Sequence, residues 1–279
     1  MEKIIIKNKK EFENKLSRIK IDGIKSLHVI SDFDKTITKA KIKGQKTHTS
    51  IAQIREGNYL SEEYVRKSYK LYDRYHPFEI NNNLSEEGIN KKMMEWWGSH
   101  INLLVQERMS RNVVEEIIIK KSIKLRKNAD KLFKLLYDKK IPFLIFSAGV
   151  GDIIKGHLKS EGLLYGNVHL ISNFFEYDEN GYVKGYKSEI IHVYNKDEFS
   201  LKKTPYFEKI KKKKNVILLG DNLGDADMVK GLSHKTILKI GFLNEDVEKN
   251  REAYQEKFDA VILNDGPMDF VVSVLKELL

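Results

Sequence analysis

Two carboxylates spaced two residues apart follow a short apolar run near the beginning of the chain. The run comprises residues 27–31, and Asp32 and Asp34 come after it, with Thr36 two residues further on. One such carboxylate can attack a phosphorus atom and carry it as an aspartyl phosphate, while its neighbour protonates the leaving oxygen and later activates water. Two close carboxylates also repel each other, which favours a shared proton or a bound cation. A strand that merely ends in solvated acids would show the same pair, so other segments must decide.

A second apolar run ends in groups that suit phosphate oxygens. Residues 141–147 end at Ser147, and Ala148 and Gly149 then open a glycine-rich turn before a helical pattern. A serine hydroxyl and the backbone N–H groups of such a turn can donate hydrogen bonds to phosphate. Further along, Lys196 could pair with phosphate, although a chain so rich in lysine does not single it out. These four residues form a candidate phosphate site.

A third run contributes two more carboxylates. Residues 216–219 lead into a Gly-Asp-x-x-x-Asp sequence that contains Asp221 and Asp225. Together with Asp32, these acids are suited to an oxygen-liganded Mg²⁺ ion that keeps some of its waters. Such an ion would neutralise the carboxylates and a phosphate together.

The elements that must position these residues are strands alternating with helices. Further short apolar runs occur at 168–172, 236–241 and 260–263, and helical spacing lies between several of the runs, for instance at 129–136. Strand alternating with helix predicts an α/β fold whose parallel sheet is covered on both faces. Ligands of such sheets bind beyond the carboxyl ends of the strands, where the candidate residues lie.

The segment between the first strand and about residue 127 departs from this alternation. It shows helical patterns and no strand run of comparable quality, which predicts a helical insertion placed where a lid could close over the site. A helical extension that only packs on the core is the alternative. We expect residues 1–38 and 127–279 to form a catalytic core and residues 39–126 to form a cap. A β-hairpin is expected at 174–187, around Asn180-Gly181.

Composition narrows the class of protein. The chain has 279 residues and no cysteine, which excludes disulfide frameworks, zinc sites that need cysteine and thiol nucleophiles. No apolar stretch approaches the roughly 20 residues that span a bilayer, so we expect a cytoplasmic protein with no membrane partner, and a monomer. A net charge of +10 raises the alternative of a non-catalytic nucleic-acid-binding protein. The basic residues are scattered, however, and no nucleic acid partner is expected.

The ordered motifs carry a resemblance to a known group of enzymes. Asp-x-Asp-x-Thr, a strand-end serine, a lysine and Gly-Asp-x-x-x-Asp occur in the order found in the haloacid dehalogenase superfamily of aspartate-dependent phosphohydrolases. In detail the chain resembles the cytosolic 5'-nucleotidase type III (pyrimidine 5'-nucleotidase) family. That similarity runs from about Ile24 to the C-terminus and rests on four segments, Asp32 to Thr36, Phe146 to Asp152, His192 to Lys196 and Leu218 to Asp221.

The resemblance implies a three-layer, Rossmann-like core with an inserted helical cap, and a role for each matched residue. Asp32 would be the nucleophile, and Asp34 would be the general acid and base whose backbone carbonyl also reaches Mg²⁺. The phosphate would be held by Ser147, Ala148, Gly149 and Lys196. The magnesium site would be completed by Asp221 and Asp225 together with Asp32.

The resemblance also implies base-binding residues in the cap. Glu79 matches an acidic residue that hydrogen-bonds the base, and Trp97 matches an aromatic residue on which the base stacks. The pyrimidine enzymes usually have a tyrosine at that position, and they have a cysteine-containing stretch where this chain has residues 47–51. A tryptophan face binds a cationic base more strongly than a tyrosine face does. The alternative for Trp96 and Trp97 is packing within the cap, because adjacent helix positions point about 100° apart.

The expected function is therefore Mg²⁺-dependent hydrolysis of nucleoside 5'-monophosphates through an aspartyl phosphate. We expect CMP and UMP as the first substrates, with 7-methyl-GMP as the alternative. Transfer of phosphate to another nucleoside is a further activity that the resemblance allows. The alternative is a phosphatase of the same superfamily acting on a small phosphomonoester such as phosphoserine.

Overall fold

A seven-stranded sheet forms the centre of the computed structural model, which describes residues 4–80, 84–196, 201–202, 204–231 and 233–279. Its strand order is β1-β11-β10-β9-β2-β5-β6, and only β1 pairs antiparallel with its neighbour. The strands are β1 (Ile4–Ile6), β2 (Leu27–Ser31), β5 (Phe143–Val150), β6 (Val168–Asn173), β9 (Asn215–Gly220), β10 (Thr236–Leu243) and β11 (Ala260–Leu263). The predicted α/β class with a mainly parallel sheet is confirmed.

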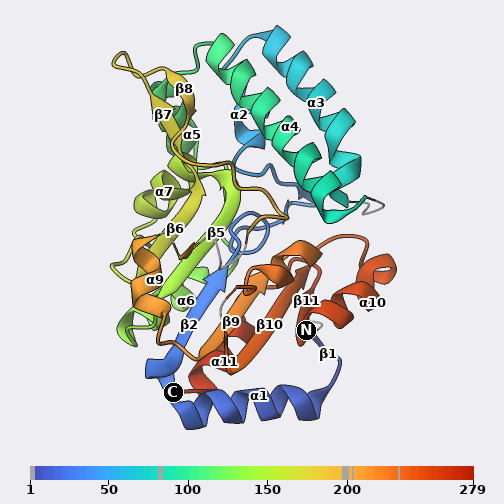
Figure 1. The fold of residues 1–279 in the computed structure, drawn as a ribbon, viewed down its shortest axis with the longest axis vertical. Coiled ribbons are helices and arrows are strands. Elements are labelled where there is room, and N and C mark those ends of the chain that lie inside the picture. Colours follow the sequence, from blue (N-terminus) through green and yellow to red (C-terminus); the bar gives the residue numbers. More distant parts are fainter. Residues whose placement is uncertain (1–3, 81–83, 197–200, 203, 232) are drawn as a thin grey trace.

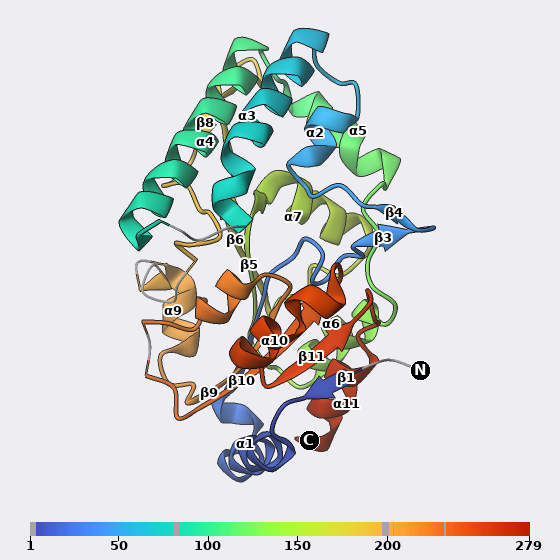
Figure 2. The ribbon, with the colours of Figure 1, turned by 90° about the vertical axis from the view of Figure 1, so that its right-hand side faces the viewer.

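Helices cover both faces of the sheet because successive strand side chains point to opposite faces and both sets are apolar. In β9, Ile217 and Leu219 belong to one buried cluster, and Val216 and Leu218 belong to the other. The first face is covered by α1 (Lys9–Asp22), α6 (Ala129–Asp138), α7 (Gly151–Ser160) and α11 (Asp269–Glu277), with η1 (Ile24–Ser26) leading into β2. The second face is covered by α9 (Pro205–Ile210), η2 (Leu223–Asp227) and α10 (Val247–Lys257). Figure 2 shows these layers on the two sides of the sheet.

The helical insertion lies above the carboxyl ends of the parallel strands (Figure 1). It contains α2 (Ala52–Glu56), α3 (Glu62–Ile80), α4 (Glu86–Gln106) and α5 (Arg111–Lys120), preceded by the two-residue strands β3 (Lys41–Ile42) and β4 (Gln45–Lys46). Strands of two residues are too short to show an alternating pattern, which is why the sequence did not predict them. None of the described helices is both long and apolar enough to cross a lipid bilayer.

The predicted hairpin at 174–187 is present as β7 (Phe175–Tyr177) and β8 (Val183–Tyr186). It lies beside the insertion in both ribbon views, and the Val183 N–H donates to the Met109 carbonyl oxygen at 2.8 Å. Ser110 also pairs with Tyr182 in an isolated β-bridge. A segment that follows β6 in the sequence therefore packs with the helices inserted after β2.

The two chain segments that connect the sheet with the insertion, residues 37–38 and 125–126, lie side by side. Thr38 forms an isolated β-bridge with Leu125, and the Arg126 N–H donates to the Ile37 carbonyl oxygen at 2.9 Å. The guanidinium group of Arg126 has no exposed surface, and it pairs with Asp265 at 3.0 Å. It also donates to the carbonyl oxygens of Thr36 at 2.7 Å, Gly266 at 2.8 Å and Lys35, and to Asn244 Oδ1 at 2.7 Å. One buried cation thus holds the turn that follows Asp34.

This arrangement predicts that Arg126→Met destabilises the protein strongly. The substitution leaves Asp265 without its counter-charge and several buried carbonyl groups without their donor, which costs about 3–5 kcal/mol when a buried pair loses one partner. Urea unfolding followed by circular dichroism measures the loss. Arg18→Met is the matched control, because Arg18 is 53% exposed and lies 3.8 Å from Glu11. Equal stabilities of the two variants would contradict the role given to Arg126.

Candidate active site

Asp32 stands at the carboxyl end of β2 in the middle of the sheet. Its N–H donates to the Leu219 carbonyl oxygen of β9 at 3.0 Å, so strand pairing continues through this residue. The β2–β9 register therefore brings the segment after β9 next to Asp32. The candidate residues from the first and third apolar runs meet at this edge, as predicted.

Lys196 joins two of these acids. Its Nζ lies 2.7 Å from Asp32 Oδ1 and 2.6 Å from Asp225 Oδ1, and the three residues are at most 7% exposed. Burial raises the pKa of Asp32 well above its ordinary value, Lys196 opposes that shift, and the charges of Asp225 and Asp221 add to it. Burial also opposes the charge of Lys196, but the two carboxylates more than offset this and raise the pKa of its ammonium group. The neighbouring carboxylates therefore favour the charged form of this buried lysine.

Asp221 and Asp225 are held by the turn that follows β9. Asp225 Oδ2 accepts the N–H groups of Asp221 at 3.1 Å and Asn222 at 3.0 Å, and this capping box begins η2. Asp221 Oδ1 accepts the Thr36 hydroxyl at 3.2 Å. Burial raises the pKa of Asp221 to about 7, and the neighbouring charge of Asp225 adds to the effect. The turn thus holds a second carboxylate that is costly to ionise without a cation.

Three carboxylates converge in a way that could hold a metal ion. Asp32, Asp221 and Asp225 each offer one oxygen, and these oxygens lie within 4.8 Å of one another. Oxygen donors of this kind suit a hard divalent cation. Both oxygens of Asp225 also accept hydrogen bonds, one from Lys196 and the other from backbone amides.

The predicted turn after Ser147 is not present, because Ala148 and Gly149 continue strand β5, and hydrogen bonds from β6 hold this part of the phosphate site. The Ala148 carbonyl oxygen accepts Asn173 Nδ2 at 2.6 Å, and the Gly149 carbonyl oxygen accepts the Ser172 hydroxyl at 2.7 Å. The Gly149 N–H donates to Ser147 Oγ at 3.0 Å, and Ser147 is buried. This end of β5 is therefore held in place, and its serine and amides lie at the same edge of the sheet as Asp32.

Asp34 is held by a residue that the sequence analysis did not select. Its carboxylate accepts both the N–H and the hydroxyl of Ser50, which precedes α2 in the insertion. Burial raises the pKa of Asp34, and the hydrogen bonds from Ser50 lower it. The sequence analysis noted residues 47–51 only for their departure from the family, and Ser50, sixteen residues from Asp34, gave no signal of this contact.

Glu79 lies near the end of α3 and faces the charged site. Its backbone carbonyl accepts the hydroxyl of Tyr194, two residues before Lys196, and its carboxylate lies 4.0 Å from His76 Nε2. Loss of water around the carboxyl raises the pKa of Glu79 to about 7, with the charges of Lys35 and Lys196 opposing the shift. Its connection to the segment of Lys196 brings the insertion and the core together.

The two tryptophans of α4 have different surroundings. Trp96 stacks on Tyr75 with ring centroids 6.2 Å apart and meets Tyr72 edge-on at 6.0 Å. Trp97 lies 6.3 Å from the ring of Tyr186 on β8. Within the described part of the chain, no recorded contact joins Trp97 to Glu79. Trp96 therefore packs between helices α3 and α4, and Trp97 faces the hairpin.

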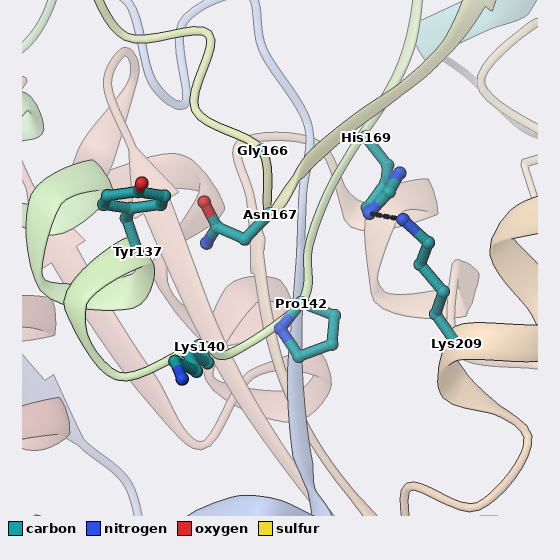
Figure 3. Close-up of a pocket in the computed structure, with 7 residues that line it drawn as sticks. All are labelled: Tyr137, Lys140, Pro142, Gly166, Asn167, His169 and Lys209. Atoms are coloured by element: carbon teal, nitrogen blue, oxygen red, sulfur yellow. Dashed lines mark hydrogen bonds between the residues drawn. The ribbon is translucent and has the colours of Figure 1, made fainter.

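A hollow of about 310 Å³ lies near the amino ends of the strands, away from the carboxyl ends that carry the aspartates (Figure 3). Pro142 and Asn167, which precede β5 and β6, line it together with Tyr137 and the hydrogen-bonded pair His169 and Lys209, whose nitrogens are 3.3 Å apart. Because the aspartates follow the carboxyl ends of the strands, this hollow at the amino ends is separate from the candidate active site.

Comparison with known proteins decides the family. The model of the pyrimidine 5'-nucleotidase (UMPH-1) family matches residues 35–279. The chain belongs to the pyrimidine 5'-nucleotidase family. Among its relatives, 7-methylguanosine phosphate-specific 5'-nucleotidase A of Xenopus laevis is 36% identical over 265 residues, which cover 95% of this chain and 91% of the relative.

Solved structures agree with that assignment. The crystal structure of cytosolic 5'-nucleotidase IIIB bound to cytidine superposes with a TM-score of 0.89 at 30% identity, and the match covers 99% of this nucleotidase and 93% of the other chain. A HAD family hydrolase from Salmonella enterica shares the fold with a TM-score of 0.59 at 13% identity, covering 91% of this chain and 73% of its own. The predicted 5'-nucleotidase with a haloacid dehalogenase fold is confirmed.

The pairing of Lys196 with Asp32 and Asp225 predicts that loss of the lysine lowers the free energy of unfolding by an amount that depends on pH. Lys196→Met leaves Asp32 without its counter-charge, so the raised pKa of that carboxyl rises further. A raised folded-state pKa contributes stability at low pH that is lost as pH rises through it, so the loss caused by the variant grows with pH. We expect the free energy of unfolding to fall by about 3 kcal/mol at pH 8 and by clearly less at pH 5.

Guanidinium unfolding in the presence of a chelator, at both pH values, tests this expectation. Lys134→Met is the matched control, since Lys134 is 67% exposed and pairs with Asp138 on the surface of α6. The control should be unchanged at both pH values. A loss for Lys196→Met that is the same at pH 5 and pH 8 would contradict the charge argument.

Proposed function

We propose that this nucleotidase hydrolyses 7-methyl-GMP and CMP with Mg²⁺, through a phosphorylated Asp32. The observation that carries the proposal is the buried cluster of Asp32, Lys196, Asp221 and Asp225 at the carboxyl edge of the sheet. This cluster offers a nucleophile, a cation for the phosphate and ligands for a hard metal ion in one water-poor site.

The residues present fit a magnesium ion. The cluster consists of oxygen donors, and ionisation of Asp221 is disfavoured by burial and by the charge of Asp225. A divalent cation would remove that penalty. Asp32 and Asp221 would hold the ion with the backbone carbonyl of Asp34, and Asp225, whose oxygens already accept hydrogen bonds, would complete or support the ligand set. When bound, the ion supplies positive charge that stabilises the transferring phosphoryl group.

In the first step, an Asp32 carboxylate oxygen attacks the phosphorus atom in line with the 5'-oxygen. The bond between phosphorus and the 5'-oxygen breaks, and Asp34 donates a proton to that oxygen, so the nucleoside leaves as an alcohol. Ser147 and the amides near Ala148 and Gly149 would bind phosphate oxygens, and Lys196 would balance their charge. The raised pKa of Asp34 favours the protonated form that this step requires.

In the second step, Asp34 accepts a proton from a water molecule, whose oxygen attacks the phosphorus atom of the aspartyl phosphate. The acyl phosphate bond breaks, free phosphate leaves and Asp32 is restored. A mostly buried site keeps bulk water away from the reacting atoms until the nucleoside has left. We propose that residues 39–126, together with the β7–β8 hairpin that packs on them, form the cap, and that residues 1–38 and most of 127–279 form the core.

We assign recognition of the base to Glu79 and Trp97. A carboxylate such as Glu79 can accept hydrogen bonds from the amino group of cytosine or of 7-methylguanine, which uracil lacks. Trp97 would stack on the base, and its ring attracts the cationic 7-methylguanine in particular. The name of the Xenopus laevis relative and the cytidine bound to the IIIB enzyme support these two bases. The word cytosolic in the name of that structure supports a cytoplasmic location. The monomeric state stays a prediction.

Asp32→Asn tests the chemistry. Because the amide is not a nucleophile, phosphate release from CMP and 7-methyl-GMP should fall by roughly 10³-fold or more, while the fold is retained. Release is measured with and without Mg²⁺ on CMP, UMP, 7-methyl-GMP, GMP, AMP and phosphoserine. Full activity of the variant would refute the mechanism, and a preference of the unaltered enzyme for phosphoserine would refute the substrate class.

Trp97→Tyr tests the base site. Since a tyrosine face attracts a cation less strongly, the ratio of kcat/KM for 7-methyl-GMP to kcat/KM for CMP should fall by roughly three- to tenfold. Trp96→Tyr is the matched control, because Trp96 packs on Tyr72 and Tyr75, and it should leave the ratio unchanged. The assignment is wrong if Trp96→Tyr lowers the ratio and Trp97→Tyr does not.

A further inference from the structure

Ser50 contacts Asp34 through two donors at once. Its hydroxyl lies 2.8 Å from Asp34 Oδ2, and its N–H lies 3.1 Å from the same oxygen and 3.0 Å from Oδ1. Within the described residues, Oδ1 accepts only from this amide. The orientation of the Asp34 carboxyl is therefore set by a residue of the insertion, although Asp34 itself follows β2.

The direction of the Ser50 hydroxyl is determined by a third contact. The Val150 N–H donates to Ser50 Oγ at 3.1 Å, which occupies a lone pair of that oxygen. The hydroxyl hydrogen is then free to point at Asp34 Oδ2. Ser50 has no exposed surface, so water does not compete for these bonds. The three contacts join the insertion, the turn after β2 and the end of β5.

The space around this contact is closed. A Cβ atom at Gly149 would lie 2.1 Å from Ser50 Oγ and 2.9 Å from Asp34 Oδ2, both shorter than real contacts allow. The segment of Ser50 is itself held, since the Gln53 N–H donates to the Thr49 carbonyl oxygen at 3.0 Å and Gln53 Oε1 accepts the Ser122 hydroxyl at 2.6 Å. Asp34 therefore has little room to turn while Ser50 is in place.

We propose that Ser50 is the positioning residue for the general acid and base. By holding Oδ2, it presents Oδ1 of Asp34 to the 5'-oxygen of the nucleotide and later to the attacking water. The proton passes from Asp34 to the 5'-oxygen as the bond from phosphorus to that oxygen breaks, and Ser50 takes no part in the transfer. Acid catalysis thus depends on the insertion occupying its place over the sheet. This inference rests on the proposed function and adds a residue to it.

The choice of leaving group tests the proposal. A nucleoside 5'-oxygen needs a proton to leave, whereas p-nitrophenolate leaves without one. We expect Ser50→Ala to lower kcat for CMP on the order of 10- to 100-fold with KM changed less than about threefold. For p-nitrophenyl phosphate, kcat/KM should fall by less than about threefold. Ser50→Cys, which keeps the size and a weak S–H donor, should be intermediate.

A control and a stability measurement separate positioning from folding. Ser68→Ala removes a buried hydroxyl from α3, where it donates to the Val65 carbonyl oxygen at 2.9 Å, and it should leave kcat for both substrates unchanged. All assays are run below the thermal transition of each variant. If Ser50→Ala does not fold, the same comparison is made with Ser50→Cys.

The outcomes distinguish this inference from the function on which it rests. If the unaltered enzyme releases no phosphate from any nucleotide, the proposed function is wrong. If it does, and the Ser50 variants lose kcat/KM equally on CMP and p-nitrophenyl phosphate or lose none, the proposed function stands and the role of Ser50 is refuted. A selective loss on CMP supports the role.

Discussion

The pairing of Lys196 with Asp32 and Asp225 is the interaction on which the site depends. Carboxylates and an ammonium group are costly to bury, and they remain ionised only where they compensate one another. The β2–β9 register places Asp32 beside the turn after β9, and the capping box of that turn aims Asp225 at the same point. Helices on both faces of the sheet exclude water from its centre. The three carboxylates gathered there could hold a metal ion.

The insertion completes the site rather than only covering it. Ser50 holds the carboxyl of Asp34, and Glu79 accepts the hydroxyl of Tyr194 from the segment that contains Lys196. Arg126 ties the returning chain to the turn between Asp34 and Thr36. The Asp34 carboxyl and the segment that contains Lys196 are thus held by contacts between insertion and core, so the position of the insertion is coupled to the geometry of the site.

Much of the fold was predictable because its signals are local. Short apolar runs, each closed by polar or small residues, gave the central strands, since a strand buried on both faces must be apolar throughout. The hairpin at Asn180-Gly181 was likewise marked by its turn. The two-residue strands β3 and β4 carry no period, and nothing in the sequence showed that the hairpin of 174–187 packs on the insertion, because that contact joins segments about seventy residues apart, such as Met109 and Val183.

The sequence by itself determined the family of this protein. The residue types at 32, 34, 147, 196, 221 and 225, each near the end of an apolar run or in a matched motif, indicated a 5'-nucleotidase family that the comparisons confirm. Only the tertiary structure decided which donor each carboxylate meets. Ser50 and Arg126 act through hydrogen bonds to partners far away in the chain, and a serine or an arginine in a connecting segment has no local pattern that indicates such a partner. Trp96 and Trp97 are equivalent in sequence, and packing against α3 or the hairpin separates them.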